Sequence, residues 1–323
     1  MSQSERIIAP EIPKVFLSPK RFGDLTSHVT KDQTDKLMNS LGLGEIADTA
    51  LFKVESVNIS GGRGERTVEV PVYQVDGFNV WDLKIKFSRV KRRSTDTSRT
   101  FVVSSDKAVI KSGHTHKEKT EVLKECAKTR DRVEAGYPVV PQVAVIADSQ
   151  TGDYFVIEPR GVTLGGKIDS AAKAYCSHGD MSGIDEVISV ISQFLRKLRD
   201  MNLSYVGSGL RRADALILFS TPDGLKTYAT DDKTFLRGFK TIWTDSIVDD
   251  IAEKAVPLPE IDDIKQEMAP HMPTASARDI EIASKREYSR QYTEHGPKRR
   301  EFKKTLLEKI KAETGVDIGE QNP

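Results

Sequence analysis

The chain has 323 residues, 37% of them hydrophobic and 30% charged, which is enough for one large two-lobed domain or two ordinary domains with hydrophobic cores. Its formal net charge of +1 gives no whole-chain electrostatic case for binding nucleic acid or an anionic membrane, and two cysteines are too few for a disulfide framework. No apolar run approaches the roughly 20 residues that span a bilayer, and the start lacks the apolar core of a signal peptide. We therefore expect a globular, cytoplasmic protein without a transmembrane segment. A protein that is delivered into another cell without a cleaved signal peptide would also lack such a signal in its sequence.

The first half of the chain changes from a short helix to a series of strands. Residues 1–30 carry three prolines among polar residues and predict an irregular lead-in, and residues 31–42 predict a short helix closed by Gly42 and Gly44. From Ala50 onward the hydrophobic period is two, which predicts an antiparallel sheet of about five strands. The predicted strands are 51–59, 67–75, 78–90, 100–105 and 107–113.

Helical spacing then takes over in two stages. Residues 115–135 predict a helix that begins with a Thr115–Glu118 capping box, and two further strands follow at 140–148 and 153–159. After Pro159 the chain is mostly helical, and residues 184–202 form its clearest amphipathic helix. Strands first and helices later predict an α+β fold in two lobes.

The order of these elements resembles the protein-kinase-like fold over roughly residues 78–255. In that family a lysine on the third strand, in a V-A-I-K context, contacts the nucleotide phosphates and pairs with a glutamate on the following helix. The sequence Ala108-Val109-Ile110-Lys111 fits this pattern, so the resemblance implies that Lys111 contacts ATP. Glu118, Glu121 and Glu125 are available as its partner. We favour Glu125 because it flanks the apolar Val122/Cys126 stripe that should face the sheet. Glu118 comes earlier on the equivalent face of the helix and is the second choice. The alternative is an ordinary strand end with glutamates on a solvated helix face.

The segment after the last predicted strand of this lobe resembles the hinge of the family. The resemblance implies that backbone groups of Pro159-Arg160-Gly161 meet an adenine ring, with Ile157 near the back of the pocket and Glu158 and Arg160 beside it. Further on, residues 215–219 and 226–230 predict a hairpin around the turn 221–224. The hairpin would carry Asp231 or Asp232 to the metal position.

Three motifs depart from the family pattern. Aligning Leu210 with the leucine of H-R-D-L-x-x-x-N puts Gly207-Ser208-Gly209 at H-R-D and Asp214 at the asparagine. The D-F-G motif is absent, although Asp214, Asp231 and Asp232 still offer oxygen ligands for Mg²⁺. The loop 91–99 contains no glycine that would let its backbone close over phosphates. A register shift of a few residues would make Asp200 or Asp214 the catalytic acid.

The last part of the chain is rich in charge. Residues 256–275 contain four prolines and predict a loop or linker, and residues 277–313 predict a charged amphipathic helix. This helix either docks through its apolar stripe or offers its basic face to a protein, phospholipid or nucleic acid. Its basic residues are Lys298, Arg299, Arg300, Lys303, Lys304, Lys309 and Lys311.

Taken with the resemblance, the sequence predicts a bilobal kinase-like protein in four parts. These are an N-terminal extension (1–49), a β-rich lobe (50–159), a helical lobe (160–255) and a charged helical segment (256–323). The favoured function is a pseudokinase, a binding or regulatory module that keeps the bilobal scaffold, with or without nucleotide binding, and acts through a surface that binds a protein partner. The alternatives are an active phosphotransferase that uses ATP and Mg²⁺ through Lys111, Glu125 and Asp214, and a protein that binds nucleic acid through its C-terminal helix.

Overall fold

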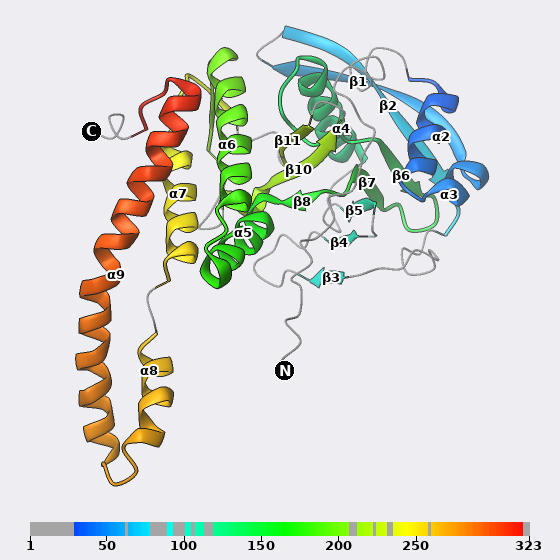
Figure 1. The fold of residues 1–323 in the computed structure, drawn as a ribbon. Helices are drawn as coiled ribbons and strands as arrows, with labels where there is room; N and C mark the ends of the chain where they lie inside the picture. Colours follow the sequence, from blue (N-terminus) through cyan, green and yellow to red (C-terminus); the bar gives the residue numbers. More distant parts are fainter. Residues whose placement is uncertain are drawn as a thin grey trace. The chain divides into compact units, whose positions relative to one another are not determined.

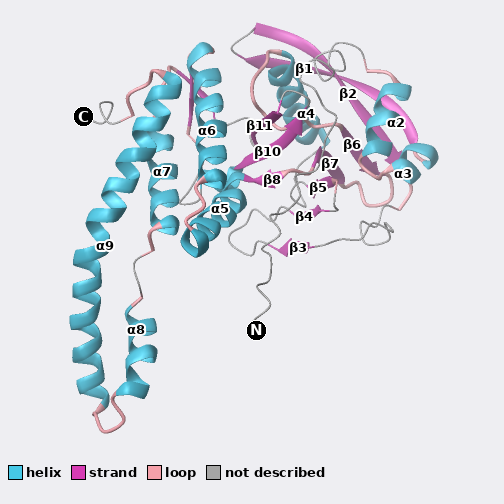
Figure 2. Cartoon of the chain, in the orientation of Figure 1, coloured by secondary structure: helices cyan, strands magenta, loops and turns pink. Residues whose placement is uncertain are grey.

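A computed structural model describes most of the chain, and its residues divide into two compact units. The sheet unit comprises residues 10–163 and 215–234, and the helical unit comprises residues 1–9, 164–214 and 235–323. Strands predominate in the first unit and helices in the second (Figures 1 and 2). The residues described are 29–61, 64–77, 89–92, 101–104, 107–112, 119–206, 212–221, 224–230, 235–257 and 260–318.

The sheet unit is built on seven strands in the order β1-β2-β6-β7-β5-β4-β3. Neighbouring strands are antiparallel except β2 and β6, which run parallel with Val72 opposite Val145. The parallel pair departs from the all-antiparallel prediction because a long crossover through β3–β5 and helix α4 separates β2 from β6 along the chain. The strands are β1 Leu51–Gly61, β2 Gly64–Val75, β3 Arg89–Arg92, β4 Phe101–Ser104, β5 Ala108–Ser112, β6 Ala144–Asp148 and β7 Tyr154–Pro159.

Helices cover both faces of this sheet. On one face α4 (Lys119–Glu134) buries Val122 and Cys126 against Val72 and Val156 of the strands, as the apolar stripe predicts. On the other face α2 (Lys31–Ser40) and α3 (Gly44–Thr49) pack over a second cluster. The predicted helix at 31–42 is therefore confirmed, and it forms part of the core of the sheet unit.

A hydrogen bond fixes α2 to the sheet, and an ion pair within the helix supports its acceptor. The hydroxyl of Tyr73, a fully buried residue of β2, donates to Asp35 Oδ1 at 2.6 Å, and Lys31 Nζ lies 2.6 Å from Asp35 Oδ2. Burial alone would raise the pKa of Asp35, but the hydrogen bonds from Lys31 and Tyr73 lower it overall. The Tyr73–Asp35 hydrogen bond therefore adds a polar link to the apolar packing between α2 and the sheet.

A second, three-stranded sheet completes the unit. It has the order β11-β10-β8, from β8 (Val162–Thr163), β10 (Leu216–Thr221) and β11 (Gly224–Ala229). The predicted hairpin is confirmed, with Thr221 opposite Gly224. Backbone hydrogen bonds between Ala229 and the segment Pro138–Val140, both 2.8 Å, tie the hairpin to the chain that leads into β6.

The helical unit contains the amphipathic helix that the sequence predicts. This helix, α6 (Ser182–Asp200), buries Ile184, Ile191 and Leu198 along one stripe. It contributes Phe194 to an aromatic group with Tyr205 and Trp243, whose ring centroids lie 5.4–5.9 Å apart. The other elements are α5 Leu164–His178, β9 Leu203–Tyr205, η1 Arg212–Ala215, β12 Phe235–Arg237, α7 Ile242–Ala255, α8 Ile261–Met268, η3 Ala269–His271 and α9 Ala277–Thr314.

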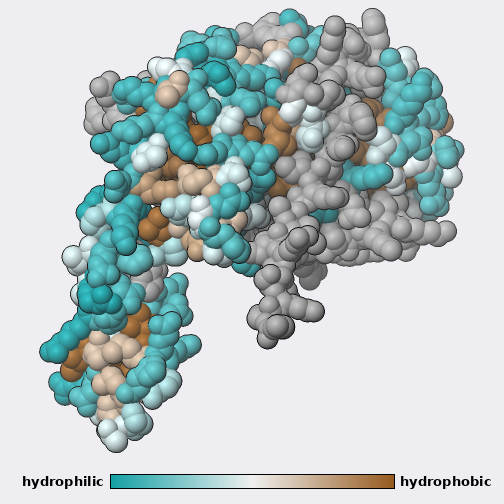
Figure 3. Space-filling model, in the orientation of Figure 1, coloured by the Kyte–Doolittle hydropathy of each residue, from teal (hydrophilic) through white to brown (hydrophobic). Residues whose placement is uncertain are grey.

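The charged C-terminal helix is confirmed, and the prediction of a loop before it is wrong in part. Helix α9 begins with a capping box between Ser276 and Asp279 and ends at Gly315, which has φ +68°. Within the predicted linker, α8 forms because the prolines lie on either side of it and Ile264 can be buried against α9. Figure 3 shows apolar side chains gathered between these two helices within a hydrophilic surround. No helix among the residues described is long and apolar enough to cross a membrane.

Candidate functional site

The lysine of the A-V-I-K sequence lies in the sheet and is paired with a buried carboxylate. Lys111 is opposite Val156 and Val109 is opposite Glu158, so Lys111 and Glu158 are diagonal neighbours on one face of the β5–β7 pair. Lys111 Nζ forms an ion pair with Glu158 Oε2. The Glu158 side chain is 3% exposed and that of Lys111 is 26% exposed. A carboxylate this deeply buried requires a cation, and Lys111 supplies it.

Further hydrogen bonds extend inward from this pair. Gln142 Nε2 donates to the second oxygen of Glu158 at 3.2 Å, and Arg130 Nη1 of α4 donates to the backbone carbonyl of Gln142 at 3.4 Å. Burial lowers the pKa of Arg130. The Cys126 thiol lies one helical turn earlier, and burial raises its pKa to about 12, so it is no nucleophile at neutral pH. The series Lys111, Glu158, Gln142 and Arg130 links two strands, a loop and α4.

The lysine and two of the three candidate glutamates can be placed, and Glu121 is exposed on α4. Glu125 is half-buried on α4, whereas Glu118 lies outside the described residues. The described ion pair of Lys111 is to Glu158, a residue that the resemblance placed beside the nucleotide. The role of Glu125 in catalysis stays a prediction. The register of β5 and β7, which brings Glu158 to Lys111, could not be read from the sequence, although both residues were singled out.

The hinge-like segment is held within the sheet unit on both sides. Pro159 has no N–H, and the N–H of Arg160 donates to the carbonyl of Lys107 at 2.8 Å. A Cβ on Gly161 would lie 2.4 Å from Ile217 Cγ2 and 2.5 Å from the carbonyl oxygen of Leu218, so this glycine permits close approach to β10. At two positions of this segment the backbone donor is thus absent, at Pro159, or occupied, at Arg160.

Ile157 lies on the opposite face of the sheet from Lys111. It is fully buried in the cluster that α2 and α3 cover, together with Ile110 and Tyr73. Because side chains alternate along a strand, Glu158 and not Ile157 takes the position beside the lysine. The residue expected at the back of a nucleotide pocket is, in the structure, a core residue.

One of the three predicted metal ligands, Asp214, lies among the described residues. Asp214 lies in η1 of the helical unit, where a Cβ on Gly165 would be 2.3 Å from its Oδ1. The carboxylate therefore lies against the first turn of α5, where the helix dipole favours a negative charge. Asp231 and Asp232 are outside the described residues. Within the described ranges, no group of three or more His, Cys, Asp or Glu residues could hold a metal ion. Magnesium binding stays a prediction.

The basic face of the C-terminal helix is largely engaged within the helical unit. Lys303 Nζ lies 3.0 Å from Asp245 and 2.7 Å from Asp249 of α7, and Lys309 Nζ lies 2.5 Å from Asp185 of α6. Arg299 Nε donates to the carbonyl of Val256 at 3.1 Å, and Phe302 stacks on Tyr175 of α5. Burial opposes the charge of Lys303, but its hydrogen bonds to Asp249 and Asp245 raise its pKa overall. These charges dock α9.

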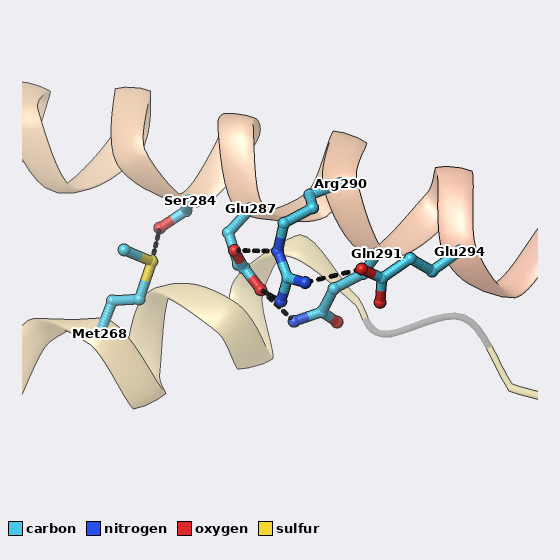
Figure 4. Close-up of polar contacts among 6 residues, drawn as sticks. All are labelled: Met268, Ser284, Glu287, Arg290, Gln291 and Glu294. Carbon is cyan, nitrogen blue, oxygen red and sulfur yellow. Dashed lines mark hydrogen bonds and ion pairs between the residues drawn. The ribbon is translucent and has the colours of Figure 1, made fainter.

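The first half of α9 is stabilised by pairs within the helix. Arg290 bridges Glu287 at 2.6 Å and Glu294 at 2.8 Å, and Gln291 donates to Glu287 at 2.7 Å (Figure 4). The hydrogen bonds from Arg290 and Gln291 lower the pKa of Glu287 to about 2. Against α8, Ser284 Oγ lies 3.9 Å from Met268 Sδ. Such i,i+3 and i,i+4 pairs stabilise the helix in addition to its packing against α8.

Comparison with known proteins gives similarity of structure only. No protein-family model and no curated protein matches the chain. Solved structures that match include WaaP in complex with acyl carrier protein, with 12% identity, a TM-score of 0.31, and 63% of this chain and 88% of that chain covered. The pseudokinase DRIK1 bound to ENMD-2076 matches at 12% identity and TM-score 0.26, covering 76% of this chain and 97% of its own. An apo pseudokinase, GRMZM2G135359, matches at 14% identity and TM-score 0.26, and the match covers 82% of this chain and 98% of that chain. Two of these three structures are pseudokinases.

Proposed function

We propose that this kinase-like protein is a binding or regulatory module of the pseudokinase type. The observation that carries the proposal is the ion pair between Lys111 and the buried Glu158. Removing the lysine would leave the Glu158 carboxylate as an uncompensated charge in the interior of the sheet unit. The presence of a lysine at position 111 is therefore explained without any nucleotide. In this proposal the lysine of the kinase-like pattern serves the fold, and a protein partner is recognised elsewhere on the surface.

Two further observations support this proposal. The hinge-like segment offers few backbone donors, because Pro159 lacks an N–H and the N–H of Arg160 is bound to Lys107. The sequence also has glycine where the family has its catalytic aspartate, at Gly209. Positioning supplies much of the rate in phosphoryl transfer, so loss of the residue that orients the hydroxyl would cost orders of magnitude in rate.

The second candidate is a phosphotransferase that uses ATP and Mg²⁺. One observation favours it: the Lys111 side chain keeps 26% of its surface exposed, so a phosphate could approach its ammonium group while Glu158 holds it. In this candidate Asp214, Asp231 and Asp232 would supply the oxygen ligands for Mg²⁺.

Calorimetric titration of Mg²⁺–ATP distinguishes the two, provided that the variants remain folded. Lys111→Ala alone is a poor probe, because it leaves Glu158 buried and unpaired. Glu158→Gln keeps the lysine, and Lys111→Met/Glu158→Gln removes both charges together. The module proposal expects no heat of binding that depends on Lys111, so the two variants should titrate alike. Binding that persists in Glu158→Gln and disappears in the double variant would refute the proposal that Lys111 is structural and support the second candidate.

A further inference from the structure

One of the two edges of the seven-stranded sheet is formed by the long strand β1. Strand β1 has 11 residues and pairs along its whole length with β2, and among the described residues no strand pairs with its other edge. Figure 1 shows it at the margin of the sheet. A long unpaired edge presents a row of backbone donors and acceptors to any other strand, and proteins usually cover or interrupt such edges.

This edge also exposes apolar side chains. Two of the six exposed large hydrophobic residues in the described part of the chain lie here, Leu51 at 59% and Val54 at 39% exposure. No proline interrupts β1. Among the described residues, the strand therefore combines an unpaired backbone edge with apolar surface, which is the combination that strand addition uses.

The charges on either side of Val54 indicate the partner. In an antiparallel pair of two identical strands centred on Val54, each Lys53 lies opposite Glu55 of the second copy, and this favourable pair occurs twice. Leu51 lies opposite Val57, and Val54 lies opposite Val54 of the second copy. Centring the pair on Lys53 or on Glu55 would instead place like charges opposite each other, which is unfavourable. Of these three registers, only the one centred on Val54 satisfies both charges.

The two charged side chains have capacity for a further contact. Lys53 Nζ donates to Gln74 at 2.6 Å and Glu55 accepts from Lys119 of α4 at 2.7 Å, and both contacts lie at the surface. An ammonium group has three donors and a carboxylate has two oxygens, so these contacts leave capacity for a second partner.

We propose that β1 is a self-association edge, which pairs antiparallel with β1 of a second copy about a two-fold axis at Val54. The contact is isologous, so it closes on itself as a dimer and does not propagate into a filament. It joins the two sheets edge to edge and covers Leu51 and Val54. It does not depend on whether the protein binds a nucleotide.

Sedimentation of the full chain from micromolar to submillimolar concentration tests this proposal. We expect a reversible monomer–dimer equilibrium in the wild type. Lys53→Glu places two glutamates opposite each other at each contact, and Glu55→Lys places two lysines there, so each variant alone should be monomeric, with dimer affinity reduced at least about tenfold. An equimolar mixture of the two should form a heterodimer, because every facing pair is then of opposite charge.

Matched variants control for folding. Lys124→Glu makes the same charge change on the exposed side of α4 and should associate as the wild type does. If Glu55→Lys unfolds because it loses the contact with Lys119, Val54→Lys places two cations at the axis instead, and Val54→Thr serves as its β-branched control. A monomeric wild type, undiminished association of Lys53→Glu, or failure of the folded charge-reversed variants to associate when mixed would each overturn the proposal.

Discussion

The strongest expectation concerns the free energy of unfolding when the Lys111–Glu158 pair is broken. Glu158 is 3% exposed and its second oxygen is bound by Gln142, so Lys111→Met leaves a buried carboxylate without its cation. Breaking such a pair on one side costs about 3–5 kcal/mol, whereas replacing both charged groups by neutral ones is often close to neutral. We therefore expect Lys111→Met to lose about 3 kcal/mol or more, and Lys111→Met/Glu158→Gln to recover most of it.

Urea unfolding of the wild type, both single variants and the double variant measures this coupling. The double-mutant cycle should give an interaction free energy of at least about 2 kcal/mol, within the upper range for residues in direct contact. Additive effects of the two substitutions would refute the reasoning, because the two side chains would then not depend on each other. A small effect of Lys111→Met would also refute it, since Glu158 would then have no need of the lysine.

Three further predictions concern packing and charge elsewhere. Gly161→Ala should destabilise the sheet unit by about 1–3 kcal/mol in thermal unfolding, because the new Cβ would meet β10. Gly296→Ala in α9 is the control, and it should be neutral or stabilising because the nearest contact of its new Cβ is at 3.8 Å. Equal effects of the two substitutions would contradict this reasoning. The Glu287 contacts in α9 favour the charged carboxylate. Their contribution to helix stability should therefore be present above pH 4.5, the ordinary pKa of a glutamate, and be lost as the pH falls through about 2. Helicity measured by circular dichroism should fall in that range in the wild type and not in Glu287→Gln. Lys303→Glu would face Asp245 and should increase hydrogen exchange at residues 298–314, and unchanged exchange would show that the ion pairs do not dock α9.

The sequence predicted elements better than it predicted contacts. Period-two alternation located β1, β2 and β5, and the apolar stripe of α4 faces the sheet, because these patterns are set by local geometry. The prolines on either side of α8 predict a continuous linker, although each of them lies outside the helix. The parallel β2–β6 pair was missed because crossover connections leave no mark in local spacing.

The site was predicted residue by residue but not as an arrangement. Lys111 and Glu158 were both singled out, but in different roles, since the strand register that joins them depends on tertiary packing. The resemblance implies a pocket position for Ile157, and alternation along β7 turns this side chain towards the cluster under α2 and α3. Nothing in the sequence around residues 31–49 indicated that these helices would cover that face.

The most direct test of the functional account is transfer of labelled phosphate from Mg²⁺–ATP, to the protein itself and to a general protein substrate. The comparison is between the wild type, Asp214→Asn and Lys111→Met/Glu158→Gln, each first shown to be folded. A binding or regulatory module predicts no transfer by the wild type above that of the double variant. Transfer by the wild type that is lost in both variants would contradict the account and identify the protein as a phosphotransferase.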